Sequence, residues 1–385
     1  MSLDSGPATT IEGADSTGRI TTGWRLWAML GIALAVALYL PWGIYPPVAI
    51  DILCFALAAV ALDLLLGFGG LLSFGHAAFW GSSAYVTGIV ALKSGLPFPV
   101  ALLAGVVAAM LLAVPIGYLS VRRQGIYFAM VTLAFAQMLY FVANQARGLT
   151  GGENGLQGVP RSFFVIEAIE TDSFYFYYAA LPIVILGMWC AWRVVHSPFG
   201  RVLVATRDNP ARARALGYNV EKYRLMVFVI SAGLCGLAGG LFAVSHGFVS
   251  LQEVYWTTSG KIVLLAVLGG IGTLWGGVLG AIIIVSLEDY LATVQFGGLS
   301  QYTGIGTITG AVFVLVILTL RKGIWGSTSD LVAMILRRRS GGEAESRDRE
   351  ETKSSTKAET QTGTKEQSQS AEPSEPSEPS EPSRE

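Results

Sequence analysis

Residues 48–81 decide the fold and read VAIDILCFALAAVALDLLLGFGGLLSFGHAAFWG. The first nineteen of them are apolar apart from two aspartates. A helix needs roughly 20 apolar residues to cross the hydrocarbon core of a bilayer. The run then breaks into glycines before the next apolar stretch begins. This pattern predicts a membrane-spanning helix that ends in a Gly-rich break.

The composition of the 385-residue chain agrees with this interpretation. Hydrophobic residues make up 52% and charged residues only 14%, against roughly 25% charged in soluble domains. Of the 53 charged residues, 19 lie in the last 47 positions, so the rest of the chain is poorer still. Too few charges remain to cover the surface of a soluble globule. A soluble enzyme, a nucleic-acid binder and a disulfide scaffold are therefore poor fits.

Apolar runs recur along the chain, and several are short and interrupted by glycine. We therefore predict an all-α, polytopic membrane helical bundle of about ten spans, with Gly-broken or re-entrant segments, among which 262–272 is a candidate half-helix. The candidate spans are 27–39, 48–66, 76–92, 100–119, 126–144, 174–190, 225–244, 262–272, 278–291 and 305–320.

The distribution of Lys and Arg predicts the orientation of this bundle. With the N-terminus inside and alternating spans, 16 basic residues fall in cytoplasmic segments and four on the opposite side. Cytoplasmic loops carry the excess of Lys and Arg in membrane proteins. We expect a multi-pass protein of the cell membrane, in contact with its lipid, with both termini in the cytoplasm.

Composition also divides the chain into four parts. Residues 1–23 form a polar arm, 24–326 the transmembrane domain and 327–340 a basic juxtamembrane segment. Residues 341–385 are rich in Glu, Pro and Ser. Such a segment cannot bury enough apolar area to offset the entropy of ordering, so we expect it to be disordered.

The basic loop at 193–224 carries a helix signal. Asn209 can cap a helix that starts at Pro210, and Gly217 can end it. This Ala- and Arg-rich helix has two interpretations. It is either a solvated loop whose arginines only set topology, or a docking helix for a soluble partner.

Two Gly-dense segments, 67–81 and 269–280, stand in the two halves of the chain. The Gly272/Gly276 and Gly236/Gly240 spacings also permit close packing of helices. Paired Gly-broken segments are typical of a transport pathway, while tight packing without a pathway role is the alternative. No Gly-Lys-Ser/Thr follows either segment, so the sequence predicts no ATP-hydrolysing site in this chain.

Few ionisable residues fall within the predicted spans, and such residues mark functional sites or buried pairs. Asp63 is an ion site or, alternatively, a hydrogen-bond partner of loop backbone near the break at 67–75. His76, at a predicted helix start, is expected to be a structural donor. Asp51, Glu288 and Asp289 are placed near span ends, where they can face water. We expect no catalytic residues and no metal site, because the histidines are dispersed and no nucleophile–base arrangement occurs.

Several of these motifs together resemble the LivM-type permease subunits of branched-chain amino-acid ABC importers. The resemblance covers about residues 24–326. The motifs that carry it are Gly70-Leu71-Leu72-Ser73, Gly75-His76-Ala77-Ala78-Phe79, 125–135, Leu149-Thr150-Gly151-Gly152, Ser197-Pro198-Phe199-Gly200-Arg201, Arg207-Asp208-Asn209, Ala215-Leu216-Gly217 and 267–276.

The resemblance implies a subunit without enzymatic activity that forms a translocation path with a second, LivH-like permease. It also implies an external solute-binding protein and two cytoplasmic ATPases, which bind ATP, so this chain needs no cofactor. The expected contacts to the ATPase are Arg201, Arg207, Asp208, Asn209, Ala215 and Gly217. The pathway or helix-break candidates are Asp63, Gly70, Ser73, Gly75, His76, Gly270, Gly272 and Gly276.

The leading hypothesis is thus a permease for leucine, isoleucine and valine. Related permeases carry urea or short amides, which keeps those solutes open. An ion-coupled secondary transporter that uses Asp63 is the alternative from another class, and a membrane scaffold whose tail recruits partners is a third. The scarcity of charge within the spans argues against the ion-coupled transporter.

Overall fold

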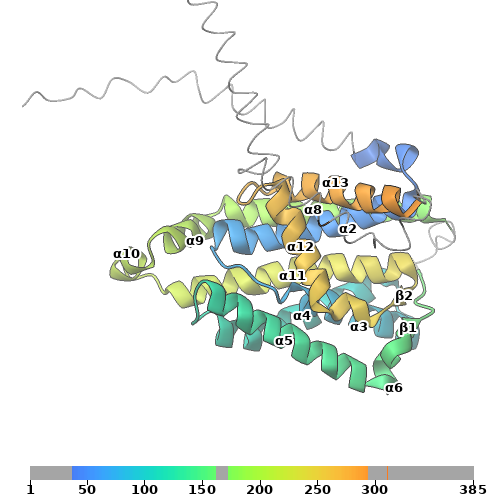
Figure 1. Ribbon diagram of the computed structural model, residues 1–385, viewed down its shortest axis with the longest axis horizontal. Coiled ribbons are helices and arrows are strands. Elements are labelled where there is room, and N and C mark those ends of the chain that lie inside the picture. Colours follow the sequence, from blue (N-terminus) through green and yellow to red (C-terminus); the bar gives the residue numbers. More distant parts are fainter. Residues whose placement is uncertain (1–36, 162–171, 294–309, 311–385) are drawn as a thin grey trace, which may run out of the picture. The chain divides into compact units, whose positions relative to one another are not determined.

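The computed structural model describes residues 37–161, 172–293 and 310, which are almost entirely helical (Figure 1). The predicted polar arm, juxtamembrane segment and tail lie outside these residues. So do most of the predicted span at 27–39 and all of 305–320 except Gly310. Residues 37–43 form a helical segment before the first named element.

The elements follow one another as helices joined by short connections, with two brief strands. They are α2 (Pro46–Asp63), the π-helical turn η1 (Leu64–Phe68), α3 (His76–Ser94), α4 (Phe98–Ser120), α5 (Ile126–Gln145), α6 (Arg147–Thr150), η2 (Gly152–Asn154), β1 (Leu156–Gln157), α8 (Ser173–Val195), α9 (Pro198–Asp208), α10 (Pro210–Ala215), α11 (Val220–His246), β2 (Phe248–Val249), η3 (Leu251–Val254), α12 (Trp256–Gly269) and α13 (Trp275–Thr293).

Within the described residues, five helices are long and apolar enough to cross a membrane, and α12 is a shorter apolar helix. The five are Pro46–Phe68, Phe98–Ser120, Ile126–Gln145, Ser173–Val195 and Val220–His246. This confirms the all-α membrane bundle. The number of ten spans and the location of the termini stay predictions.

The buried centre of the bundle consists of α2 and α11. Nearly every residue of α2 is buried, and α11 packs against α2, α3 and α4. Close approach is possible because Gly236 and Gly240 of α11 have no side chains. A Cβ atom added at Gly236 would lie 2.7 Å from Ala109 Cβ, and one added at Gly240 would lie 2.6 Å from Leu102 Cδ1. The Gly236/Gly240 spacing therefore does serve close helix packing.

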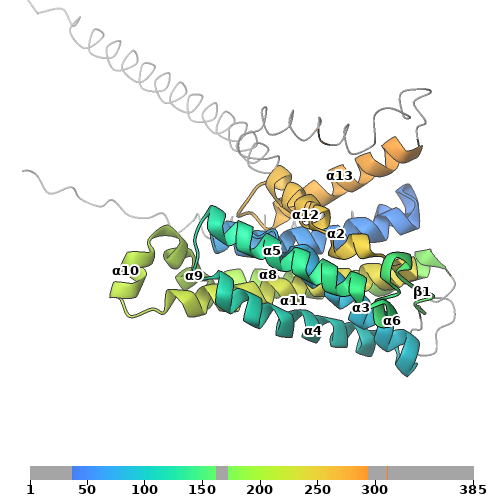
Figure 2. The same cartoon turned by 60° about the horizontal axis from the view of Figure 1, so that its bottom comes forward.

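The outer helices α4, α5 and α8 each bury one face and expose large apolar side chains on the other, as expected for contact with lipid. α12 and α13 pack against α2; α13 lies on the side of α2 away from α4 (Figure 2), whereas α12 also contacts α3. The bundle thus has two ends. One carries α9 and α10, and the other carries α6 and the antiparallel β1–β2 pair (Figure 1).

Several helices extend a few residues beyond the predicted spans, among them α8 (Ser173–Val195) and α11 (Val220–His246). The expected half-helix at 262–272 begins earlier, at Trp256, and ends at Gly269. Gly272 lies in the turn before α13 at φ +80°, so Gly272 and Gly276 are not a pair on one helix. Gly270 and Gly272 both adopt positive φ in this turn, a conformation that glycine reaches without steric cost.

Candidate functional site

At one end of the bundle, α9 and α10 form an elbow that we define as residues 197–218. Each helix begins with the same signal, a capping side chain followed by proline. Ser197 Oγ accepts a hydrogen bond from Gly200 N at 3.3 Å, and Asn209 Oδ1 accepts one from Arg212 N at 2.9 Å. The prediction of α10 is confirmed. Helix α9 was not predicted, although the Ser197-Pro198 pair is the same N-cap and proline signal that predicted α10.

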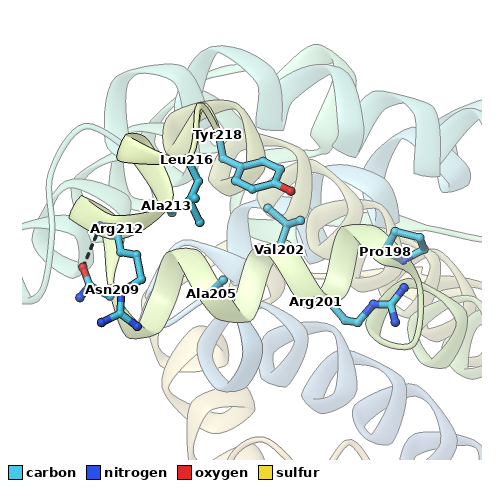
Figure 3. A pocket seen from close by; sticks show the side chains of 9 residues that line it. All are labelled: Pro198, Arg201, Val202, Ala205, Asn209, Arg212, Ala213, Leu216 and Tyr218. Carbon is cyan, nitrogen blue, oxygen red and sulfur yellow. Dashed lines mark hydrogen bonds between the residues drawn. The ribbon is translucent and has the colours of Figure 1, made fainter.

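A groove of about 370 Å³ lies between the two helices of the elbow (Figure 3). Its residues are contributed by α9, by α10 and by the turn that follows α10. They are Pro198, Arg201, Val202, Ala205, Asn209, Arg212, Ala213, Leu216 and Tyr218. The groove therefore combines an aliphatic floor with two guanidinium groups.

The elbow is held to the bundle by its buried face and presents its other face to the outside. Leu203 and Thr206 of α9 are buried. Leu216 is 71% exposed, and Arg201 and Arg212 are exposed as well. The exposed face of the elbow therefore presents an apolar side chain together with cations.

The predicted contact residues of this elbow do not all face the same way. Arg201 and Asn209 line the groove, and Ala215 and Gly217 are exposed at the end of α10. Arg207 instead points towards the bundle, where its Nη1 donates a hydrogen bond to the carbonyl oxygen of Gly67. Its Nε also donates to Asp208 Oδ1 at 2.9 Å.

The first Gly-broken segment, at residues 67–81, contacts Arg207 through Gly67 and Gly70. Gly70 adopts φ +69°, and a Cβ atom there would lie 2.6 Å from Arg207 Cγ. Ser73 is buried, and its Oγ accepts a hydrogen bond from Gly75 N at 3.1 Å. His76 begins α3, is fully buried and lies with Nε2 2.9 Å from Ser231 Oγ. These contacts are those of a closely packed helix break.

The second Gly-broken segment meets the first one. The Asp63 carboxylate accepts hydrogen bonds from Gly272 N at 2.6 Å and Leu274 N at 2.9 Å. Asp63 is thus a hydrogen-bond partner of loop backbone close to the break at 67–75, and that backbone belongs to a turn some 210 positions away in the sequence. Gly270 and Gly276 frame the same turn, where Gly276 N donates to Thr273 Oγ1 at 3.0 Å.

Ionisable side chains also pair at the other end of the bundle. Lys261 Nζ lies 2.6 Å from Glu288 Oε2, and His246 Nε2 lies 3.7 Å from Asp51 Oδ1. Asp51 and Glu288 thus lie close to partners on other helices, and their side chains stay 23% and 30% exposed.

Glu253 lies outside the spanning helices, in η3, and accepts a hydrogen bond from Trp80 Nε1 at 2.8 Å. Burial raises the pKa of its carboxyl group, which the Trp80 N–H opposes. Among the described residues, no cluster of His, Cys, Asp and Glu could hold a metal ion.

The bundle and the elbow together define the class of this protein. It is a multi-pass helical membrane protein whose two Gly-broken segments meet in its interior, close under a basic two-helix elbow.

The comparisons with known proteins narrow the class to a family. Residues 47–327 match the family described as the permease component of branched-chain amino acid transport systems. The chain belongs to this family of transport permeases, and the expected LivM-type permease is confirmed.

Individual relatives agree with the family match. The high-affinity branched-chain amino acid permease LivM of Escherichia coli K12 is 29% identical over 62% of this chain and 61% of its own length. LivM of Salmonella typhimurium is 28% identical over 69% of this chain and 68% of its own length. The autoinducer 2 import permease LsrC of Salmonella paratyphi B is 29% identical over 56% of this chain and 61% of its own. No solved structure matches the chain.

Proposed function

We propose that this chain is a permease subunit of an ATP-driven importer for leucine, isoleucine and valine. It forms the translocation path with a second, LivH-like permease and receives its solute from an external binding protein. The importer has two cytoplasmic ATPases, and the elbow of this chain is the surface on which an ATPase docks. The family and the similarity to two LivM proteins support the solute, while the similarity to LsrC means that relatives differ in the solute they carry.

The observation that carries the docking role is the elbow itself. Its two short helices are separately capped, and its groove joins an aliphatic floor to Arg201 and Arg212. A soluble partner with an apolar side chain and carboxylates fits this surface, because burial supplies affinity and charge supplies orientation. A loop whose arginines only set the topology would not need two separately capped helices.

The ion-coupled alternative has less support. Both oxygens of Asp63 already accept backbone N–H groups. A coupling ion would have to displace those hydrogen bonds, each of which involves a charged acceptor and is stronger than a neutral one.

The experiment combines co-purification with uptake. The tagged chain, extracted in mild detergent, should bring down a second permease and two ATPases, and cells should accumulate labelled leucine in competition with isoleucine and valine. Competition by urea or acetamide instead would contradict the solute, and uptake by the purified chain alone on an ion gradient would contradict the class.

A double variant, Arg212→Glu with Leu216→Asp, tests the docking surface. It reverses one charge of the groove and removes its apolar contact, so recovery of the ATPases should fall more than tenfold while the chain still inserts. The matched control is Lys222→Glu, a charge reversal at the start of α11 outside the groove. Equal loss in the control would mean that overall charge, not the groove, attracts the ATPases.

A further inference from the structure

The two Gly-broken segments meet without a side chain between their backbones. A Cβ atom added at Gly67 would lie 2.5 Å from both Asp63 Oδ1 and Gly272 N. Real Cβ atoms do not approach other atoms so closely, so η1 and the turn at 270–274 are in direct backbone contact. A movement of one segment must therefore displace the other, because closely packed atoms leave no free space between them.

Asp63 fastens this contact. Its carboxylate is fully buried, and its two oxygens accept from Gly272 N at 2.6 Å and from Leu274 N at 2.9 Å. Leu274 adopts φ +55°, an unfavourable conformation for a residue with a Cβ atom. Such a conformation persists only where surrounding contacts hold it, and the Asp63 carboxylate is one of those contacts.

Arg207, on α9 of the elbow, contacts η1 as well. Its Nη1 donates to the carbonyl oxygen of Gly67, and its aliphatic stem packs against Gly70. The last carbonyl groups of a helix have no partner within it, so a side-chain donor from elsewhere satisfies this one. η1 is a π-helical turn, and such turns often occur where a helix is adapted for function.

We propose that Arg207, the carbonyl group of Gly67 and Asp63 form a relay that transmits movement of the elbow to the turn at 270–274. The relay rests on the proposed function, because a docked ATPase has to move α9. Arg207 and Asp63 act as positioning residues, which set the angle between α12 and α13 without touching the solute. The turn they control has positive φ at Gly270, Gly272 and Leu274. A small displacement of this turn therefore changes the direction of the axis of α13, which follows it.

The test uses the complex with its co-purifying partners in proteoliposomes, with ATP hydrolysis and leucine uptake measured together. Arg207→Ala and Asp63→Ala should each lower the leucine carried per ATP at least tenfold while partner recovery is unchanged. The double variant should be no worse than the more severe single one, because residues of one path are not additive. Lys222→Ala, which removes a charge from the same end of the bundle, should behave as wild type.

Asp63→Asn keeps one of the two acceptors and should restore part of the coupling, which covers the case that Asp63→Ala fails to fold. A second measurement detects the movement itself. Ile271 is 49% exposed, so in a Cys190→Ser background Ile271→Cys should react with a thiol reagent at a rate that depends on ATP. Arg207→Ala should abolish that dependence.

A wild-type ratio of uptake to hydrolysis in both single variants, or ATP-dependent labelling that survives Arg207→Ala, would overturn the relay and leave the proposed function intact. A wild-type chain that brings down no ATPase would overturn the proposed function and the relay with it.

Discussion

At the scale of single residues, packing in the interior of this protein depends on the absence of a side chain at Gly67 as much as on the Asp63 carboxylate. Gly67 has no side chain, and its carbonyl group, together with the Asp63 carboxylate, links three segments far apart in sequence. The sequence identifies Gly67 as part of a Gly-dense segment and Asp63 as an ionisable residue within a predicted span. It does not say that Arg207 is the donor to Gly67, because no local pattern joins positions 140 residues apart.

The first prediction concerns Gly67. Gly67→Ala places a methyl group 2.5 Å from Gly272 N, and overpacking of this kind costs about 1–3 kcal/mol. The melting temperature of the purified chain should fall, and leucine uptake should fall with it. Gly260→Ala is the matched control, since a Cβ atom there meets nothing within 4 Å. A melting temperature lowered equally by both changes would contradict this account.

At the scale of elements, the elbow depends on its caps. α10 runs only from Pro210 to Ala215, and isolated helices of this length are unstable in water. Its start is fixed by the Asn209 side chain, so the presentation of Arg212 and Leu216 depends on one hydrogen bond of 2.9 Å. The same argument applies to Ser197 and α9.

The second prediction is that Asn209→Ala weakens ATPase binding about fivefold, because loss of an N-cap costs about 1 kcal/mol. Asn209→Ser keeps a capping oxygen and should bind nearly as wild type. Affinity can be measured with the detergent-solubilised chain and its purified ATPase. If serine were as damaging as alanine, Asn209 would act through its amide group and not through the cap.

At the scale of the whole molecule, the two ends of the bundle differ in charge and construction. The elbow carries exposed arginines, while the other end carries α6 and the β1–β2 pair, in which Leu156 lies opposite Val249. The excess of basic residues at the elbow predicts that this end faces the cytoplasm.

The third prediction tests that orientation in a Cys190→Ser background. Leu216→Cys and Leu149→Cys replace side chains that are 71% and 55% exposed at opposite ends. A membrane-impermeant maleimide should label Leu149→Cys in intact cells and Leu216→Cys only after lysis. The reverse pattern would contradict the predicted topology.

The sequence by itself determined the membrane class, the family and most helix positions, because apolar runs, caps and glycine breaks are local signals. The starts of α3 at His76 and of α10 at Pro210 were predicted correctly. Only the tertiary structure decided that Asp63 binds the turn at 272–274, and that Arg207 reaches Gly67. Backbone groups carry no residue-specific signal, so contacts that depend on them appear only once the helices are packed.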